Sequence, residues 1–231
     1  MNMPPNDKPE STAESCQATF AGADEDQGLA DKIDREHPNL ACEAFPVSPI
    51  SPGPVSEDET LLRVMVSPRD VDDAGFVHET PFRKIAKNGL SVIRSIAARH
   101  EVEALVSDGM YSKVSDPPKQ IRAAYEAKAG SDGLRGLVDS TGERVLGVYD
   151  QTVPQSDKSA PHIPTHAGIF LRLPAPGTAG RKLIQKDFAG QVREMFLSSP
   201  KELASLHDGL FIEINSRSAE GQFVKAPDAN K

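Results

Sequence analysis

Apolar and polar positions alternate most clearly over residues 165–173. The apolar positions recur at every second residue and predict a strand with one face in a core: Ala167, Ile169, Leu171 and Leu173. The opposite face carries four dissimilar residues: His166, Gly168, Phe170 and Arg172. Pro174 ends the strand, because proline has no backbone N–H to donate to a neighbouring strand.

Similar patterns predict the remaining elements. Further strands are expected over residues 61–66, 134–138, 144–149 and 210–214. Helical spacing predicts helices over 119–129, 182–197 and 200–206, with helical turns over 81–88 and 91–100 and a short helix over 28–36. The order shows no regular strand–helix–strand alternation. We therefore predict a single α+β domain whose mixed or mainly antiparallel sheet is flanked by helices.

Residues 1–58 differ in composition from the rest of the chain. They are rich in Pro, Ser, Asp, Glu and Gly, and their few apolar residues are scattered. Such a segment buries too little apolar surface to offset the entropy lost on ordering. We therefore predict a disordered acidic N-terminal arm over 1–58, a globular domain over 59–216 and a polar tail over 217–231.

Charge is distributed as unevenly as hydrophobicity. The chain of 231 residues has a net charge of −8, yet its first 60 residues hold 13 acidic and 3 basic side chains, a balance of −10. The remaining residues hold 21 acidic and 23 basic side chains, a balance of +2. This near-neutral body gives no case for nucleic-acid binding. No apolar run approaches the ~18 residues of a membrane span and no secretory leader is visible, so we expect a soluble cytoplasmic protein.

Both cysteines, Cys16 and Cys42, lie in the acidic arm. Their placement excludes a disulfide-stapled body and a thiol nucleophile within the body. In a flexible segment we expect the two cysteines to form neither a disulfide nor a metal site. His162 and His166 have a spacing found in metal sites, but Pro164 between them excludes the helix that would align them, and we predict no metal.

His166 is the leading candidate for a catalytic residue. It would act as a general base at the mouth of the sheet, with Gly168 leaving room for a ligand. The alternative is a structural histidine at a strand edge, bonded to a loop.

A second constellation consists of Arg63, Ser91 and Glu213. An arginine on an early strand, a serine after a turn and a glutamate on a late strand follow an order that resembles one class of ADP-ribosyltransferases. The resemblance implies that Arg63 holds phosphates or ribose and that Glu213 stabilises a developing oxocarbenium ion. The family's Ser-Thr-Ser and second acidic residue are replaced by Leu90-Ser91-Val92 and Phe211, and Glu213 also fits a residue that faces water.

These observations lead to two hypotheses on function. The first is a binding or interaction module whose partner is another protein, because the sequence contains no complete catalytic signature. The alternative is a small transferase or hydrolase acting on a nucleotide-like or other anionic substrate. Its catalytic residues would be His166 and Glu213, and Arg63, Ser91 and Arg172 would bind the ligand. The sequence identifies no cofactor.

Overall fold

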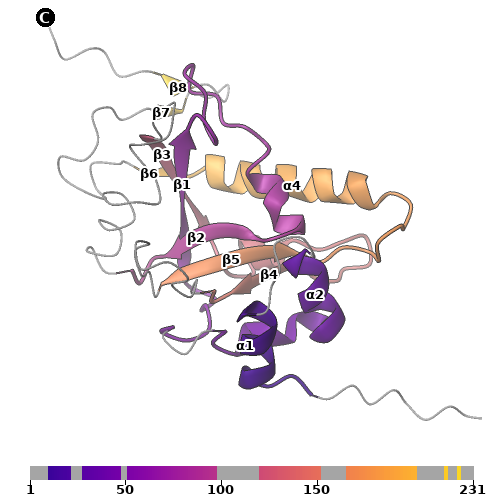
Figure 1. Ribbon diagram of the computed structural model, residues 1–231. Helices are drawn as coiled ribbons and strands as arrows, with labels where there is room; N and C mark the ends of the chain where they lie inside the picture. The colour runs from indigo at the N-terminus through magenta and orange to yellow at the C-terminus, as the bar shows by residue number, and fades with distance from the viewer. Residues whose placement is uncertain are drawn as a thin grey trace, which may run out of the picture.

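The computed structural model describes residues 10–21, 28–47, 51–97, 120–151, 165–201, 216–217 and 223–224. It confirms an α+β fold built on an antiparallel sheet (Figure 1). Six strands pair in the order β4-β5-β2-β1-β3-β6. Their bounds are β1 Thr60–Ser67, β2 Leu90–Arg94, β3 Gln120–Lys128, β4 Leu146–Tyr149, β5 His166–Leu171 and β6 Pro200–Lys201. A separate two-stranded sheet pairs β7 Ser216–Arg217 with β8 Phe223–Val224.

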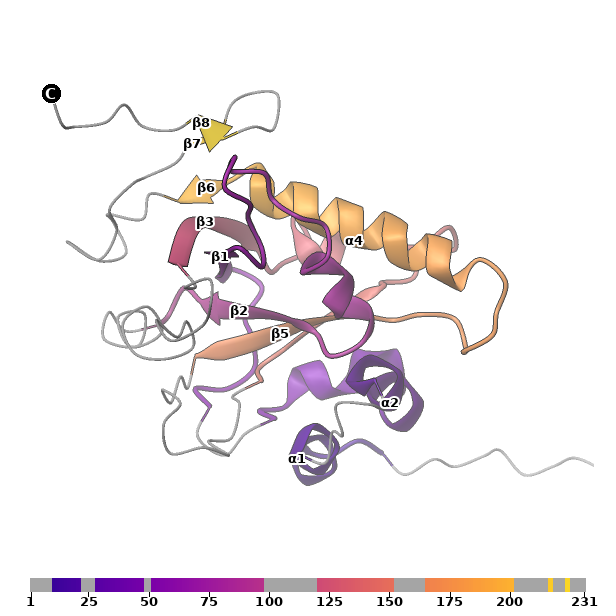
Figure 2. The ribbon, with the colours of Figure 1, turned by 45° about the horizontal axis from the view of Figure 1, so that its top comes forward.

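Helices cover both faces of the large sheet. Their bounds are α1 Ala13–Ala21, α2 Leu29–Glu36 and α4 Arg181–Leu197, with 3-10 helices η1 Pro38–Ala44, η2 Phe82–Ala86 and η3 Leu134–Gly136. Figures 1 and 2 show α4 on one side of the sheet and α1 and α2 on the other. Of the helices within the described ranges, none has the length and apolar content needed to cross a bilayer.

The larger core lies between the sheet and α4. The apolar face predicted for β5 is confirmed, because Ala167, Ile169 and Leu171 are buried in this core. Val192 and Phe196 of α4 belong to the same core and are fully buried. Each large aliphatic or aromatic side chain removed from water here stabilises the fold by roughly 1.5–3 kcal/mol.

A second, smaller core lies on the opposite face of β5. Phe170 packs against Tyr149 of β4 and Phe20 of α1, with ring centroids 5.7 and 5.9 Å away, and Phe20 lies 5.3 Å from Tyr149. The Phe170 ring covers Gly89, where a Cβ atom would overlap it. The face that we expected to receive a ligand is therefore partly covered by the N-terminal segment.

Within the segment predicted to be disordered, the structure describes residues 10–21, 28–47 and 51–58. Helices α1, α2 and η1 bury apolar side chains against β4 and β5. Residues 1–9, 22–27 and 48–50 lie outside the described part of the chain. Hereafter "the arm" means the ordered residues between 10 and 58.

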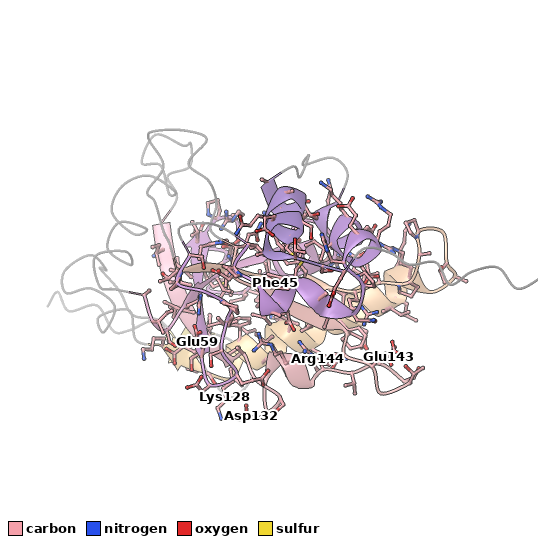
Figure 3. The ribbon with its side chains drawn as sticks, turned by 90° about the horizontal axis from the view of Figure 1, so that it is seen from below. Phe45, Glu59, Lys128, Asp132, Glu143 and Arg144 are labelled. Carbon is pink, nitrogen blue, oxygen red and sulfur yellow. A yellow bond between two sulfur atoms is a disulfide. The ribbon has the colours of Figure 1, made fainter. Side chains whose placement is uncertain are left out.

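Ion pairs explain how so acidic a segment folds. Carboxylates of the arm and of the adjoining Glu59 pair with arginines from the body: Asp31 with Arg181, Asp34 with Arg172, Glu43 with Arg135 and Arg144, and Glu59 with Arg94. Figure 3 shows Arg144 and Glu59 from the side of the arm. The uneven charge of the sequence thus corresponds to charge complementarity between the arm and the body of one molecule.

The expectation for the cysteines is wrong, because Cys16 of α1 and Cys42 of η1 form a disulfide. Their Cα atoms lie 5.7 Å apart, and the bond closes a loop with a sequence separation of 26. Closing a loop of this length restricts the unfolded chain and stabilises the folded state by roughly 3.5 kcal/mol in the chain-entropy model.

The predicted helix over 119–129 is also wrong, because this segment forms β3. Strand β3 lies between β1 and β6 and pairs with β1 along its whole length. Tyr125 and Ala127 join the larger core. Pairing on both sides overrides the helical spacing of Ile121, Ala124 and Tyr125, because strand formation depends strongly on neighbouring strands.

Smaller differences affect three other segments. The segment predicted as helical over 91–100 contains most of β2, and the strand predicted over 134–138 contains η3. The helix predicted from Pro200 begins instead as β6, and its continuation lies outside the described residues. The predicted strand over 210–214 also lies outside them.

Candidate functional site

Pairing between β2 and β5 brings two candidate residues together. Ser91 is opposite Gly168 and Ile93 is opposite His166, so Ser91 and His166 are diagonal neighbours on one face. The Ser91 hydroxyl oxygen lies 2.5 Å from Nε2 of His166. His166 is buried, whereas Ser91 is partly exposed. A ligand at this site would therefore meet the hydroxyl first.

The hydrogen bonds assign the tautomer of His166. Its Nδ1 atom contacts the main-chain carbonyl oxygen of Gln151, which can only accept. Nδ1 therefore carries the proton and donates it to Gln151, and Nε2 keeps a lone pair. The Ser91 hydroxyl then donates to Nε2. This is the orientation in which a neutral imidazole takes a proton from a hydroxyl group.

The surroundings keep the imidazole neutral. Burial lowers the pKa of His166 from its ordinary value of 6.5, and the positive charge of Arg63 lowers it further. The hydrogen bond to the Gln151 carbonyl opposes these two effects. Because burial dominates, His166 is available as a proton acceptor near neutral pH.

Arg63 supports the same site from β1. The β1–β2 ladder contains only the pairs Leu61–Arg94 and Leu62–Ile93. Beyond this ladder, Nη1 of Arg63 donates a 2.8 Å hydrogen bond to the main-chain oxygen of Ser91. A side chain thus takes the place of a missing strand-to-strand bond. Arg63 acts here as a positioning residue for Ser91.

A buried carboxylate fixes the arginine. Nη2 of Arg63 lies 3.3 Å from Oδ2 of Asp70, which is fully buried. Arg69 also binds Asp70, with distances of 2.7 Å from Nε to Oδ1 and 2.8 Å from Nη2 to Oδ2. Two guanidinium groups therefore share one carboxylate. The three groups together carry one net positive charge, next to the main chain of Ser91.

Arg172 does not join this site. It follows the end of β5, six positions after His166, which corresponds to about 20 Å along a strand. Its Nε donates to Asp34 of α2 at 2.9 Å, so it holds the arm. Glu213 lies outside the described residues. The space expected above Gly168 is filled, because a Cβ there would overlap the side chains of Gln151 and Phe170.

Sequence reasoning missed the partners that orient the pair. Gln151 contributes a main-chain oxygen, which every residue type has, so no sequence signal identifies it. Asp70 follows β1 closely, but only the turn after the strand brings it back under Arg63. The arm also contains a group that sequence analysis dismissed, because Cys16, His37 and Cys42 lie together and are buried.

Comparison of this chain with protein-family models, with curated proteins and with solved structures finds no match. The function is therefore inferred from the chemistry of the site itself.

Proposed function

We propose that the protein is an enzyme that acts on a nucleotide-like anionic substrate, with the Ser91–His166 pair at its reacting centre. The observation that carries this proposal is the 2.5 Å contact between the Ser91 hydroxyl and Nε2 of His166. Arg63 joins the pair through the main-chain oxygen of Ser91. Ser91 and His166 contact each other through their side chains, and the Arg63 side chain contacts the main chain of Ser91.

The reaction class that we propose is transfer of ADP-ribose from NAD. Two described members of the constellation that resembles ADP-ribosyltransferases, Arg63 and Ser91, are in contact. In this reaction the bond between the ribose and nicotinamide breaks, and the same ribose carbon bonds to water or to an acceptor hydroxyl. Nicotinamide leaves, and the neutral His166 takes the proton released by the water or hydroxyl. The net positive charge of Arg63, Arg69 and Asp70 favours binding of the diphosphate.

The test is release of nicotinamide when the full chain is incubated with NAD. Ser91→Ala and His166→Gln are each expected to lower the rate at least ~100-fold, a typical contribution of acid–base catalysis. His78→Gln is the matched control, because His78 lies outside the pair. The proposal is excluded if the parent chain releases nicotinamide no faster than Ser91→Ala and NAD does not raise the melting temperature of the parent chain.

Binding of another protein is the second candidate function. Its support comes from apolar side chains in contact with water, since Leu183 of α4 is 71% exposed and Phe76 is 50% exposed. Leu183 borders a hollow of about 490 Å³ between α4 and Glu79. Contiguous exposed apolar patches mark protein-binding surfaces, and this candidate requires that Leu183 belong to such a patch.

The acidic charge of the arm gives this second candidate less support than the sequence suggested, because several of its carboxylates pair with arginines of the same chain. A direct test uses a purified binding partner. Leu183→Glu should abolish the complex, and Lys182→Glu, which changes a neighbouring residue, should leave it. Retention of the complex in Leu183→Glu would exclude this surface.

We also propose a cytoplasmic location, and the state of the cysteines tests it. Cytosolic proteins keep their cysteines reduced, whereas disulfides persist in oxidising compartments. A cytoplasmic chain should therefore hold Cys16 and Cys42 as thiols, in place of the disulfide that the structure contains. Alkylation of intact cells before lysis measures this state. Two modified cysteines support the cytoplasm, and complete protection by the disulfide points to an oxidising compartment.

A further inference from the structure

Cys16, His37 and Cys42 form a compact buried group within the arm. They come from α1, the end of α2 and η1, and their potential ligand atoms all lie within 4.8 Å of one another. Sγ of Cys16 lies 3.9 Å from Nδ1 of His37. All three residues are buried, so their convergence results from the packing of three separate elements.

The hydrogen bonds of His37 assign its tautomer and leave Nδ1, which lies 3.9 Å from Sγ of Cys16, without a proton. Nε2 lies 2.9 Å from the hydroxyl of Thr19, and this hydroxyl donates its only proton to Glu36 at 2.8 Å. The hydroxyl must therefore accept from Nε2, which carries the ring proton. Nδ1 is left unprotonated on the side of Cys16. It accepts from the Ser11 hydroxyl at 3.0 Å.

This arrangement is that of a metal-binding histidine. Histidine ligands usually donate their second ring N–H to an oxygen that is itself held by hydrogen bonds. Here Thr19 and Glu36 supply that support. The hydrogen bonds to Ser11 and Thr19 hold the ring of His37 beside the disulfide.

We propose that reduction of the Cys16–Cys42 disulfide creates a zinc site formed by both thiolates and Nδ1 of His37. A dithiol reductant breaks the S–S bond, becomes a disulfide itself and leaves two protein thiols. Binding of Zn²⁺ then displaces one proton from each thiol. Thiolate and imidazole ligands suit zinc, which is tetrahedral with three protein ligands and one further position. A zinc ion at Nδ1 would displace the Ser11 hydroxyl, which now donates to that atom.

The geometry needs only a small rearrangement. Tetrahedral zinc with bonds of about 2.3 Å to sulfur holds two sulfur atoms ~3.8 Å apart. The ligand atoms already lie within 4.8 Å of one another, so side-chain rotation around the freed cysteines suffices. The metal would link α1, α2 and η1 in a reducing environment, as the disulfide links α1 and η1 in an oxidising one. This inference does not depend on the proposed enzyme activity.

Cobalt binding to the full chain tests the proposal, because Co²⁺ replaces zinc and reports its ligands by absorption. The chain is reduced with a water-soluble phosphine, which is removed without air before Co²⁺ is added. We expect one equivalent of Co²⁺, with a thiolate-to-cobalt charge-transfer band and the visible bands of a tetrahedral site. The oxidised chain should show neither band. Absence of thiolate bands in the reduced chain would overturn the proposal.

Variants identify the ligands. His37→Gln should weaken Co²⁺ binding at least ~10-fold, and Thr19→Val should weaken it ~10-fold or more by removing support from His37. His78→Gln should bind like the parent chain. Equal affinity in His37→Gln and the parent would exclude His37 as a ligand. If His37→Gln does not fold, the melting temperature of the reduced parent with Zn²⁺ decides: a rise supports the site, and no rise overturns it.

Discussion

Glu43 of η1 accepts a 2.7 Å hydrogen bond from Nη2 of Arg144, a residue 101 positions further along the chain. The same carboxylate accepts from the main-chain N–H of Val148 at 2.6 Å and lies 3.3 Å from Nε of Arg135. One side chain of the arm thus satisfies groups of η3, of the segment before β4 and of β4 itself. The arm is therefore part of the folded structure in the same sense as the sheet.

Glu43→Gln should destabilise the protein by roughly 1–3 kcal/mol, because the buried Arg135 and the half-buried Arg144 lose a charged partner while the amide still fits the space. The measurement is the free energy of unfolding in urea. Glu143→Gln, at an exposed residue labelled beside Arg144 in Figure 3, is the control and should change stability by less than ~0.5 kcal/mol. Equal effects of both changes would contradict the role of Glu43.

Phe20→Ala should destabilise the protein by about 3 kcal/mol, because it opens a cavity between Tyr149 and Phe170. Denaturant unfolding measures the loss, and limited proteolysis shows whether cleavage begins in the arm. Phe76→Ala removes a ring that is 50% exposed and that lies 5.7 Å from the Arg193 guanidinium. Its cost should stay near ~1 kcal/mol or below. A smaller effect for Phe20 than for Phe76 would show that the second core contributes little.

Asp150 should make stability fall as pH rises. Its side chain is fully buried beside Arg94, and burial raises its pKa from 3.8 to about 7, against the opposing effect of Arg94. Between these two values the folded chain holds a proton that the unfolded chain has lost. Unfolding is therefore favoured as pH increases, by up to ~1.4 kcal/mol per pH unit.

Asp150→Asn should remove this slope, and urea unfolding from pH about 4 to about 8 measures it. Asp73→Asn changes an exposed aspartate and should leave the slope in place. A slope that persists unchanged in Asp150→Asn would assign it to other groups.

Arg63→Gln should raise the pKa of His166, because the positive charge of Arg63 lowers that pKa in the folded protein. Arg63→Lys keeps the charge and should keep the pKa low. Chemical shifts of the imidazole protons, followed by NMR against pH, give both values. An unchanged pKa in Arg63→Gln, in a chain that remains folded, would show that the two residues are not coupled electrostatically.

The sequence allowed the central parts of the fold to be predicted where periodicity reflected burial. β5 and α4 appear as expected, since Ile169 and Leu171 face one core and Val192 and Phe196 complete it. β3 was missed because Ala123, Ala124 and Ala127 carry no marked strand preference. Its conformation is set by β1 and β6, which are distant in sequence.

The arm was missed for a different reason. Composition estimates how much apolar surface a segment can bury alone, and this segment folds by using surface supplied by β4 and β5. Pairs such as Asp34 with Arg172 join residues 138 positions apart. No local pattern contains that information, although the opposite charges of the two regions were visible.

The candidate site was predicted in part. His166, Ser91 and Arg63 were each selected from strand patterns or residue order, and the strand register brings them together. Arg172 shares the strand face of His166 but lies too far along it. Alternation identifies the face of a residue, whereas the neighbour it meets depends on pairing.

The docking of the arm also determines where the chain can be cut for laboratory work. A fragment that starts at Glu59 would lose the carboxylates that pair with Arg144, Arg172 and Arg181, and would expose Tyr149 and Phe170 to solvent. Such a fragment would tend to aggregate through its exposed apolar surface, and it would be more basic than the whole protein. A fragment for expression or crystallisation should therefore begin before Ser11, because the hydroxyl of Ser11 already contacts His37.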